Sequence, residues 1–420
     1  MFKLAFRGVS RYKKRTLITA FAIAIAIIFS IFMQTLITGI RYQSNKNLIW
    51  NDTSSAKIYA PGYFDDREYL PIDKLISNEA GKTLEKLLDE NNYTNYTKEF
   101  DSSGQIMFYE DPFPTSGSLT VNFKAIDSSH SNAYNLNDAK IKGQWISKNI
   151  DGVVLGSKLA SDIKADIGYY LTVQTKGKDG FIQAFDIPII GIIGIGDPMI
   201  DASTVFFDIN TLDDYLELEG SATCYAVSYS MNIAKIKSIT DTETIKLKKI
   251  AQKANLEAYS WKEIAEEILR FEAADGGFAY IFLFFTFVIS IVGISNTMLM
   301  SISERKNEIA MLKALGYGNS YIRKLFTLEG TIIGSIGVII GTVIGLIISF
   351  YYQIVGIDFS SFTKDTTSIG YRINTVVHAF ISLNDILLIV ILGLFFSMLA
   401  AYLAVRRTGR GEIAELFRKV

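Results

Sequence analysis

The chain has 420 residues, of which 49% are hydrophobic and 20% are charged, and its mean hydropathy is +0.24. This composition is too apolar for an ordinary soluble protein and too polar for a chain made only of membrane spans, so it predicts spans together with a large hydrated domain. A net charge of −1 argues against a nucleic-acid-binding protein, and the single cysteine, Cys224, excludes an internal disulfide and a thiolate–metal cluster.

Four uncharged apolar runs are each long enough to cross the hydrocarbon core as a helix. They are Leu17–Ile40, Phe278–Ile302, Thr331–Ile357 and Ile386–Val405. The first run has 24 residues and lacks an A-x-A cleavage site near its end, which favours a retained span over a signal peptide. The sequence therefore predicts an α-helical membrane protein with four transmembrane helices.

Basic residues flank these runs unequally, and Lys and Arg mark the cytoplasmic side of a membrane protein. Residues 1–16 contain six Lys or Arg and no acid, and 303–330 and 406–420 contain five Lys or Arg each. The connection 358–385 contains only Lys364 and Arg372. We therefore expect a multi-pass protein of a bacterial inner (plasma) membrane with both termini cytoplasmic and residues 41–275 extracytoplasmic.

These patterns divide the chain into eight segments. They are a cytoplasmic amphipathic lead with the first span (1–40), an extracytoplasmic domain that ends in a stalk-like helix (41–275), the second span (276–302), a cytoplasmic loop (303–330), the third span (331–357), a short outer loop (358–385), the fourth span (386–405) and a cytoplasmic tail (406–420).

The segment 41–275 has the composition of a folded domain and contains 24 Lys or Arg against 35 Asp or Glu, a net charge of −11. Its length suits one large or two small folded units. Short apolar or alternating runs predict strands at Gln105–Tyr109, Leu119–Ile126, Val153–Leu155, Tyr170–Thr175, Ile187–Ile193, Thr204–Phe207 and Tyr225–Tyr229. Helical patterns occur at Asp73–Asn91, Ser157–Lys164 and Asn210–Leu218, the last with Asp208 or Asn210 as N-cap. We therefore predict an α+β domain between the first and second spans.

A longer helical pattern covers Asp241–Phe271, with a break near Asn255–Ser260, and leads into the second span. A helix continuous with a span would carry motion outside the membrane into it. A helix packed only on its own domain would show the same pattern, so the sequence leaves both interpretations open.

The chain lacks a recognisable catalytic constellation. Gly81, Lys82 and Thr83 resemble the end of a phosphate-binding loop, but Ile76 stands where that loop needs glycine. No G-x-S-x-G, H-E-x-x-H or C-x-x-C pattern occurs, and the acidic pairs Asp65–Asp66 and Asp213–Asp214 are typical of a solvated surface. We therefore expect no enzyme activity, no cofactor and no metal site, and energy supplied by a partner.

The third run is rich in glycine. Gly334 precedes Gly337, Gly341 and Gly345, which are four residues apart and share one helix face. Small residues at this spacing let helix backbones approach closely in lipid, so we expect a helix-packing seam, although glycine is also frequent in spans generally.

The stretch SERKNEIAMLKALG, Ser303 to Gly316, is a charged amphipathic segment between two spans. Ile309, Leu312 and Leu315 recur every three residues and give one apolar edge, while Arg305 and Glu308 can pair at i, i+3. A short helix on the membrane surface would look the same.

Two of these segments together resemble ABC-transporter permeases of the MacB/FtsX/LolC–LolE type. The opening FRGVSRYKKRTLITAFAIAIAI is similar to the first helix of that family, with a basic lead running into Arg15, Thr16 and Leu17. SNTMLMSISERKNEIAMLKALG resembles the family signature at the end of the second span, at Asn296, Leu299, Glu304, Arg305, Glu308, Ile309, Lys313, Ala314, Leu315 and Gly316.

The resemblance implies a permease subunit that pairs with a second, identical or paralogous permease subunit amid membrane lipids and is driven by a separate cytoplasmic ABC ATPase dimer. It also implies that the charged segment is an ATPase-coupling helix, carried by Glu304, Arg305, Glu308, Ile309, Lys313 and Gly316. In its length, its four spans and its lack of a fused ATPase domain, the chain most resembles the lipoprotein-releasing members of the family. Those members pass a lipoprotein substrate to a periplasmic carrier. An exporter of peptides, antibiotics or other amphiphiles with an adaptor, or a non-transport regulator of a cell-wall hydrolase, remain alternatives.

Overall fold

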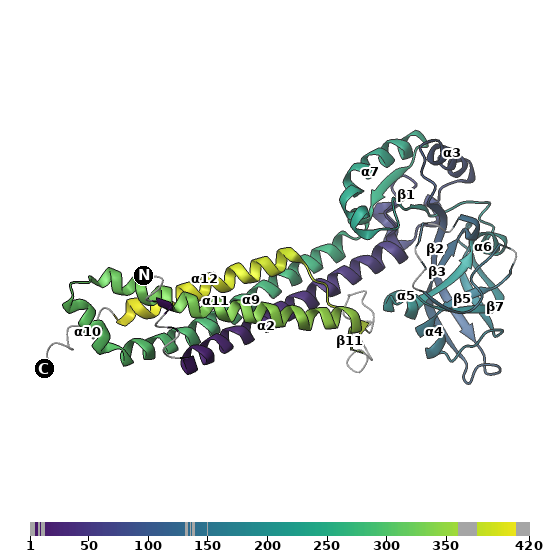
Figure 1. Ribbon diagram of the computed structural model, residues 1–420. Helices are drawn as coiled ribbons and strands as arrows, with labels where there is room; N and C mark the ends of the chain where they lie inside the picture. The colour runs from purple at the N-terminus through teal and green to yellow at the C-terminus, as the bar shows by residue number, and fades with distance from the viewer. Residues whose placement is uncertain are drawn as a thin grey trace. The chain divides into compact units, whose positions relative to one another are not determined.

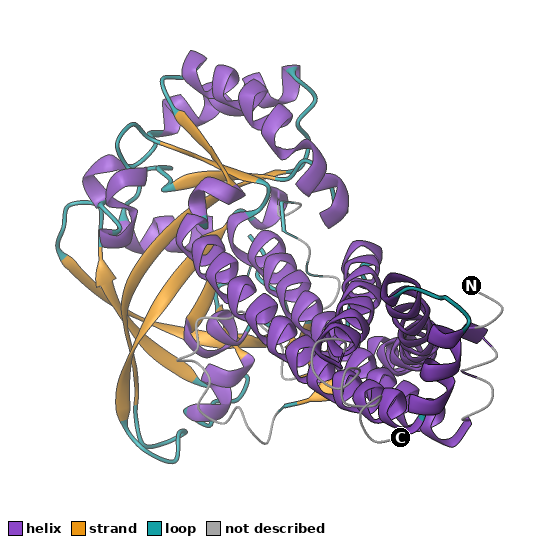
Figure 2. Ribbon diagram, turned by 90° about the vertical axis from the view of Figure 1, so that its left-hand side faces the viewer, coloured by secondary structure: helices purple, strands orange, loops and turns teal. Residues whose placement is uncertain are grey.

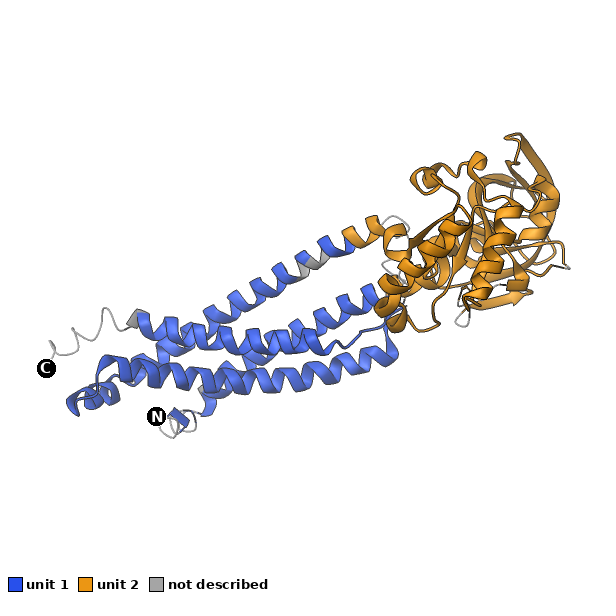
Figure 3. Ribbon diagram, turned by 90° about the horizontal axis from the view of Figure 1, so that it is seen from above, with its two compact units in different colours: residues 1–42, 271–358, 376–420 blue, residues 43–270, 359–375 orange. Residues whose placement is uncertain are grey.

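The computed structural model describes residues 5–6, 9, 13–130, 133–134, 136, 139–148, 150–359 and 376–408. The chain forms two compact units, which Figure 3 colours separately. We call residues 1–42, 271–358 and 376–420 the helical unit and residues 43–270 with 359–375 the sheet unit. Most of the predicted basic lead, residues 360–375 of the outer loop and the tail beyond Thr408 lie outside the described residues.

Long apolar helices build the helical unit (Figure 1). They are α2 (Lys13–Leu48), α9 (Glu266–Glu304), α11 (Asn319–Val355) and α12 (Leu383–Thr408), with the shorter α10 (Lys306–Ala314) between α9 and α11. The four long helices are each long and apolar enough to cross a membrane. The predicted four-helix membrane architecture is therefore confirmed, and the protein is a multi-pass membrane protein.

The core of the helical unit consists of branched and aromatic side chains from α2, α9, α11 and α12, including Ile27, Ile31, Phe287, Val338 and Ile389. The lipid-facing sides of the same helices stay apolar, so a membrane rather than a second protein layer suits them. Two short strands, β11 (Ile357–Asp358) and β12 (Val376–Val377), pair near the end of α11.

The sheet unit contains a ten-stranded mixed sheet, drawn in orange in Figure 2. Its strands are β1 (Ala56–Tyr59), β2 (Tyr96–Phe108), β3 (Gly117–Ile126), β4 (Lys140–Gly143), β5 (Val153–Gly156), β6 (Tyr170–Lys176), β7 (Ile182–Gly194), β8 (Thr204–Asp208), β9 (Cys224–Val227) and β10 (Glu257–Ser260). The order is β10-β1-β9-β2-β3-β8-β5-β7-β4, and β6 pairs with both β2 and β7. Six strands, β2-β3-β8-β5-β7-β6, therefore close on themselves as a small barrel.

Helices cover the rest of this unit. They are α3 (Asn78–Glu90), α4 (Ser157–Asp162), α5 (Pro198–Ser203), α6 (Ile209–Leu216), α7 (Ile233–Lys253) and α8 (Trp261–Ile264), with a π-helical turn at Ile49–Thr53 and 3-10 turns at Phe64–Tyr69, Ile72–Lys74 and Ser128–His130. Asp208 caps α6 by accepting a hydrogen bond from the Asn210 backbone. The predicted α+β domain between the first and second spans is thereby confirmed.

Several hydrophobic cores hold the sheet unit together, and the two largest lie in different parts of it. One fills the barrel and contains side chains such as Phe100, Phe123 and Phe207. The other lies between the β10-β1-β9 extension and helices α3 and α7, with Leu84 and Leu247 fully buried. Residues 43–270 nevertheless belong to a single compact unit.

The strands and helices of this unit differ in detail from the sequence prediction. All seven predicted strands occur, whereas β1, β4 and β10 were not predicted. The break near Asn255–Ser260 contains β10, and α7 begins at Ile233, before the predicted helical pattern. Downstream of that break, α9 runs unbroken from Glu266 into the second span, as the lever interpretation requires.

Candidate functional site

The charged segment between the second and third spans forms a sharp helical joint. Helix α9 ends at Glu304, α10 begins at Lys306, and Arg305 lies between them with a backbone that is no longer helical (φ −101°, ψ 21°). After α10, Gly316 adopts a positive φ of 87°, which suits glycine, and α11 begins at Asn319. The chain therefore reverses through a short helix with a break at each end.

The Arg305 side chain ties this joint to α11. Its Nε donates a hydrogen bond to Glu308 Oε2 at 2.6 Å, and its Nη1 lies 2.9 and 2.7 Å from the two carboxylate oxygens of Glu329. The guanidinium also stacks over the Phe326 ring at 5.1 Å. Because the Arg305 side chain is 12% exposed and that of Glu329 2%, these are largely desolvated charges held by several contacts each.

The i, i+3 pair between Arg305 and Glu308 was predicted from the sequence, and Glu329 was not. Glu329 lies 24 residues along the chain, on α11. The one signal for it in the sequence is an acid placed just before an uncharged run, and that signal carries no information about its partner.

Apolar packing at the joint is carried by Ile309. It is buried in a cluster with Ile302, Ile322, Phe326 and Val405. Leu312 is half-buried and Leu315 is 69% exposed, so the predicted apolar edge is only partly covered. An open apolar surface therefore remains on this segment, made by Met311, Leu315 and Tyr317, which are all exposed.

The other predicted residues of this segment differ in their exposure. Glu304 is exposed, Lys313 is half-buried, and a Cβ on Gly316 would meet nothing within 4 Å. The joint thus combines a paired, buried side with an open side that carries apolar and charged groups.

The glycines of α11 lie at two close helix contacts. A Cβ on Gly337 would stand 2.6 Å from the Ala20 carbonyl oxygen, and one on Gly341 would stand 2.7 Å from that of Ala24, both on α2. Gly345 faces α2 with more room, its nearest contact being 3.3 Å. A Cβ on Gly334 would stand 2.3 Å from the Ser397 Cβ on α12.

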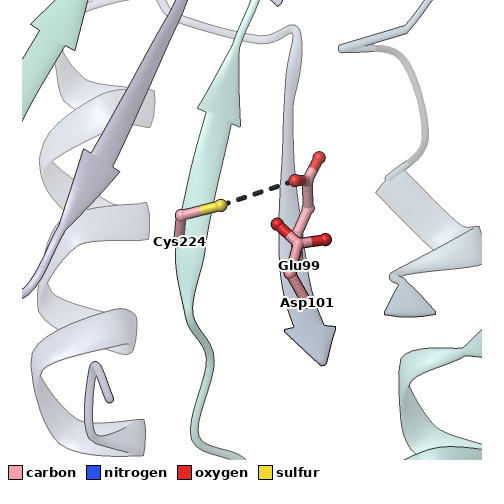
Figure 4. Close-up of side chains that lie close together, drawn as sticks. All are labelled: Glu99, Asp101 and Cys224. Atoms are coloured by element: carbon pink, nitrogen blue, oxygen red, sulfur yellow. Dashed lines mark hydrogen bonds between the residues drawn. The ribbon is translucent and has the colours of Figure 1, made fainter. Parts of the chain in front are cut away.

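A second charged cluster lies inside the sheet unit (Figure 4). Carboxylate and thiol atoms of Glu99, Asp101 and Cys224 lie within 4.8 Å of one another, a spacing that could hold a metal ion. Lys57 Nζ, however, is 2.9 Å from Glu99 Oε2, and Lys124 Nζ is 3.7 Å from the same oxygen. Two lysines already neutralise this group, and a divalent cation would have to displace them.

The protonation of this cluster supports the same conclusion. Burial alone would raise the pKa of Glu99, but the charges of Lys124 and Lys57 hold that pKa below its usual value. Burial raises the pKa of the Cys224 thiol, so the thiol stays protonated and donates to Glu99 at 3.4 Å. The residues fit a buried ion-pair network better than a metal centre.

Residues of the acidic pairs and of the partial phosphate-loop motif make contacts within the fold. Asp66 pairs with Lys74, and Asp213 accepts a hydrogen bond from the Gly220 backbone. Gly81 lies inside α3, where a Cβ would stand 2.5 Å from the Tyr225 hydroxyl. Interior helix positions leave no backbone N–H free to bind phosphate.

Comparison with known proteins places the joint inside a recognised domain. Residues 280–413 match the FtsX-like permease C-terminal family. A stretch of 63 residues is 43% identical to the ABC transporter permease YtrF of Bacillus subtilis, covering 15% of this chain and 14% of that protein. A stretch of 158 residues is 23% identical to the lipoprotein-releasing system transmembrane protein LolC of Neisseria meningitidis, covering 35% of this chain and 36% of LolC.

Among solved structures, the periplasmic region of MacB from Actinobacillus actinomycetemcomitans is 16% identical, with a TM-score of 0.34, and covers 51% of this chain and 93% of that one. The chain spans about a third or less of the length of the curated relatives described above.

Proposed function

We propose, from the premise that the chain carries an FtsX-like permease domain, that it is the transmembrane permease subunit of an ABC transporter. A separate cytoplasmic ATPase dimer supplies the energy, and a second permease subunit, identical or paralogous, completes the membrane part. In this proposal both termini and the α10 joint are cytoplasmic and residues 41–275 lie outside, and the basic flanks of the spans support that orientation.

The Arg305 joint is the observation that carries this proposal. It presents Met311 and Leu315 to solvent while Arg305 and Glu329 fasten its other side to α11. A partner that binds the open side of α10 therefore exerts force on α11 through a charge-assisted, multidentate contact. Because Arg305 directly follows α9, the same force reaches that helix as well.

Helix α9 provides the route for relaying that force. It is one unbroken helix of 39 residues, from Glu266 to Glu304, and spans about 58 Å at the usual helical rise. Because no break interrupts its hydrogen bonding, we propose that displacement at the Glu304 end is transmitted toward the Glu266 end. In this mechanism ATP binding acts on the sheet unit through α9, and the substrate does not pass through a central pore.

Charge reversal at Glu308 tests the coupling role. In the chain purified with the ATPase that accompanies it, Glu308→Lys should reduce substrate-stimulated ATP hydrolysis severalfold, because it opposes Arg305 at 2.6 Å. Asp179→Lys, an exposed position between β6 and β7, is the control for the charge change and should hydrolyse ATP as wild type does. Normal coupling in Glu308→Lys would refute the assignment.

For the substrate we propose lipoproteins, which the complex would release from the inner membrane to a periplasmic carrier. The support is the partial similarity to LolC together with the permease domain. Depletion of the protein should trap mature lipoproteins in the inner membrane, as measured by membrane fractionation. Normal lipoprotein sorting combined with hypersensitivity to peptides or antibiotics would instead favour the exporter alternative.

A further inference from the structure

A groove of about 800 Å³ lies in the sheet unit, between α7 and the turn that follows α3. These two helices pack against each other at the edge of the second core (Figure 1). The groove is lined by four lysines of α7, by polar residues of the turn and by two tyrosines, among them Lys235, Lys246, Lys249, Lys253, Tyr93 and Tyr229. Neither the barrel nor the ion-pair network around Glu99 contributes to it.

The lysines form a stripe along one helix face. Lys235, Lys246, Lys249 and Lys253 fall within about 60° of one another at 100° per residue, opposite the buried face that contains Leu247. From Lys235 to Lys253 the stripe extends about 27 Å at the usual rise per residue. A single small anion cannot contact all four ammonium groups over that length, whereas an elongated ligand can.

Little of this positive charge is neutralised within the chain. Glu243 pairs with Lys246 and accepts a hydrogen bond from the Tyr93 hydroxyl. Among the described residues, Lys235, Lys249 and Lys253 have no ion-pair partner. This concentration of lysine contrasts with the segment 41–275 as a whole, whose net charge is −11.

We propose that this groove binds a linear polyanion made of polyol or sugar units joined by phosphodiester groups. Lysines act as hydrated point charges that suit successive phosphates without demanding one fixed geometry. Asn91, Asn92 and Asn95 offer amide donors and acceptors for the hydroxyls between the phosphates. The ligand would be held mainly by charge, with its backbone hydroxyls bound by the turn.

Two other anionic partners suit the site less well. A flat lipid surface cannot enter a concave groove along its length. A single-stranded nucleic acid would need exposed aromatic faces on which its bases stack, whereas the two tyrosines of the groove are half-buried and hydrogen-bonded to Glu243 and Thr244. The groove shares no residue with the Arg305 joint, so a failure to bind the polymer would leave the coupling proposal unaffected.

Binding can be measured with the full chain in neutral detergent micelles. The probe is a fluorescent poly(glycerol phosphate) oligomer, compared with inorganic phosphate, with vesicles of phosphatidylglycerol and with an oligothymidylate of equal charge. We expect the oligomer to bind most tightly, with an affinity that falls steeply as salt is added because counterions are released. Inorganic phosphate at the same phosphate concentration should not compete measurably.

Paired variants identify the surface responsible. Lys249→Gln/Lys253→Gln should weaken oligomer binding on the order of tenfold or more. Lys142→Gln/Lys158→Gln removes the same charge from exposed positions outside the groove and should bind as wild type does. Equal loss in both double variants, no binding by the wild-type chain, or stronger lysine-dependent binding of vesicles or oligothymidylate would overturn the proposal.

Discussion

Each unit contains a buried carboxylate that is held by basic side chains, Glu99 in the sheet unit and Glu329 in the helical unit, and their surroundings differ. Glu99 is fully buried in β2 and is shared by Lys57 on β1 and Lys124 on β3. Glu329 is 2% exposed on α11, and both of its carboxylate oxygens accept from Nη1 of Arg305, which stands at a break between two helices. Glu99 lies among hydrogen-bonded strands, whereas Glu329 pairs with a residue at which the helical structure is interrupted.

This difference suggests different mechanical roles. Lys57 and Glu99 are carried by strands that are joined through β9 by the β1–β9 and β9–β2 pairings, so the backbone holds the cluster in place within the sheet. Arg305 instead has a non-helical backbone between two helices, and its side chain contacts Glu308, Glu329 and Phe326. The buried charges around Glu99 thus hold strands of the sheet together, whereas those around Arg305 hold a helix at a joint.

The largest expected effect comes from removing the Glu99 charge. Glu99→Gln leaves two buried lysines without their shared partner and should destabilise the sheet unit by about 4 kcal/mol. All three tryptophans, Trp50, Trp145 and Trp261, belong to the sheet unit, so tryptophan fluorescence during denaturant unfolding reports on that unit alone.

The neighbouring carboxylate provides the control for this experiment. Asp101 is 29% exposed and 3.7 Å from Lys57, so Asp101→Asn should cost much less. If both variants lose the same stability, the cluster is not organised around Glu99.

The corresponding change in the helical unit should have a smaller effect on stability and a larger one on function. Arg305→Gln removes the positive charge that pairs with Glu329 and should destabilise the joint by about 2 kcal/mol, less than at Glu99 because solvent reaches Arg305. Substrate-stimulated ATP hydrolysis should fall, while unfolding followed by tryptophan fluorescence stays as in wild type. A shift in that unfolding curve would show that the joint also stabilises the sheet unit.

A joint can transmit movement only if the spans behind it are tightly packed. Gly341→Ala places a methyl group 2.7 Å from a backbone oxygen of α2 and should cost roughly 1 kcal/mol in thermal unfolding followed by circular dichroism. Gly345→Ala, with its nearest contact at 3.3 Å, is the matched control and should be nearly neutral. If both variants unfolded at the same temperature as wild type, close packing at these glycines would not be part of the mechanism.

The smallest expected effect is a dependence of the unfolding free energy on pH that is confined to acidic conditions. Because the folded-state pKa of Glu99 is lowered, its stabilising contribution is present above its usual pKa, near 4.5, and is lost as the pH falls through the folded-state value. The difference in unfolding free energy between wild type and Glu99→Gln should therefore shrink from about pH 6 to about pH 3. A constant difference would mean that Glu99 is not charged in the folded protein.

The sequence by itself determined the features that depend on local composition and spacing. Uncharged runs of about 20 residues specify the spans, because a helix of that length satisfies its own backbone in lipid. Alternating apolar residues revealed strands such as β3 and β6, and the spacing of Arg305 and Glu308 revealed their pairing. Gly337 and Gly341 share a face simply because they are four residues apart.

Only the tertiary structure decided the features that join distant segments. Strand β1 was not predicted because Lys57 interrupts its apolar pattern, and its partner Glu99 is 42 residues away. Closure of the barrel depends on β6 pairing with both β2 and β7. Glu329 reaches Arg305, and the lysines of α7 border a groove, only because the chain folds back on itself. Local periodicity fixes the direction in which a side chain points, whereas the group it meets is fixed by packing.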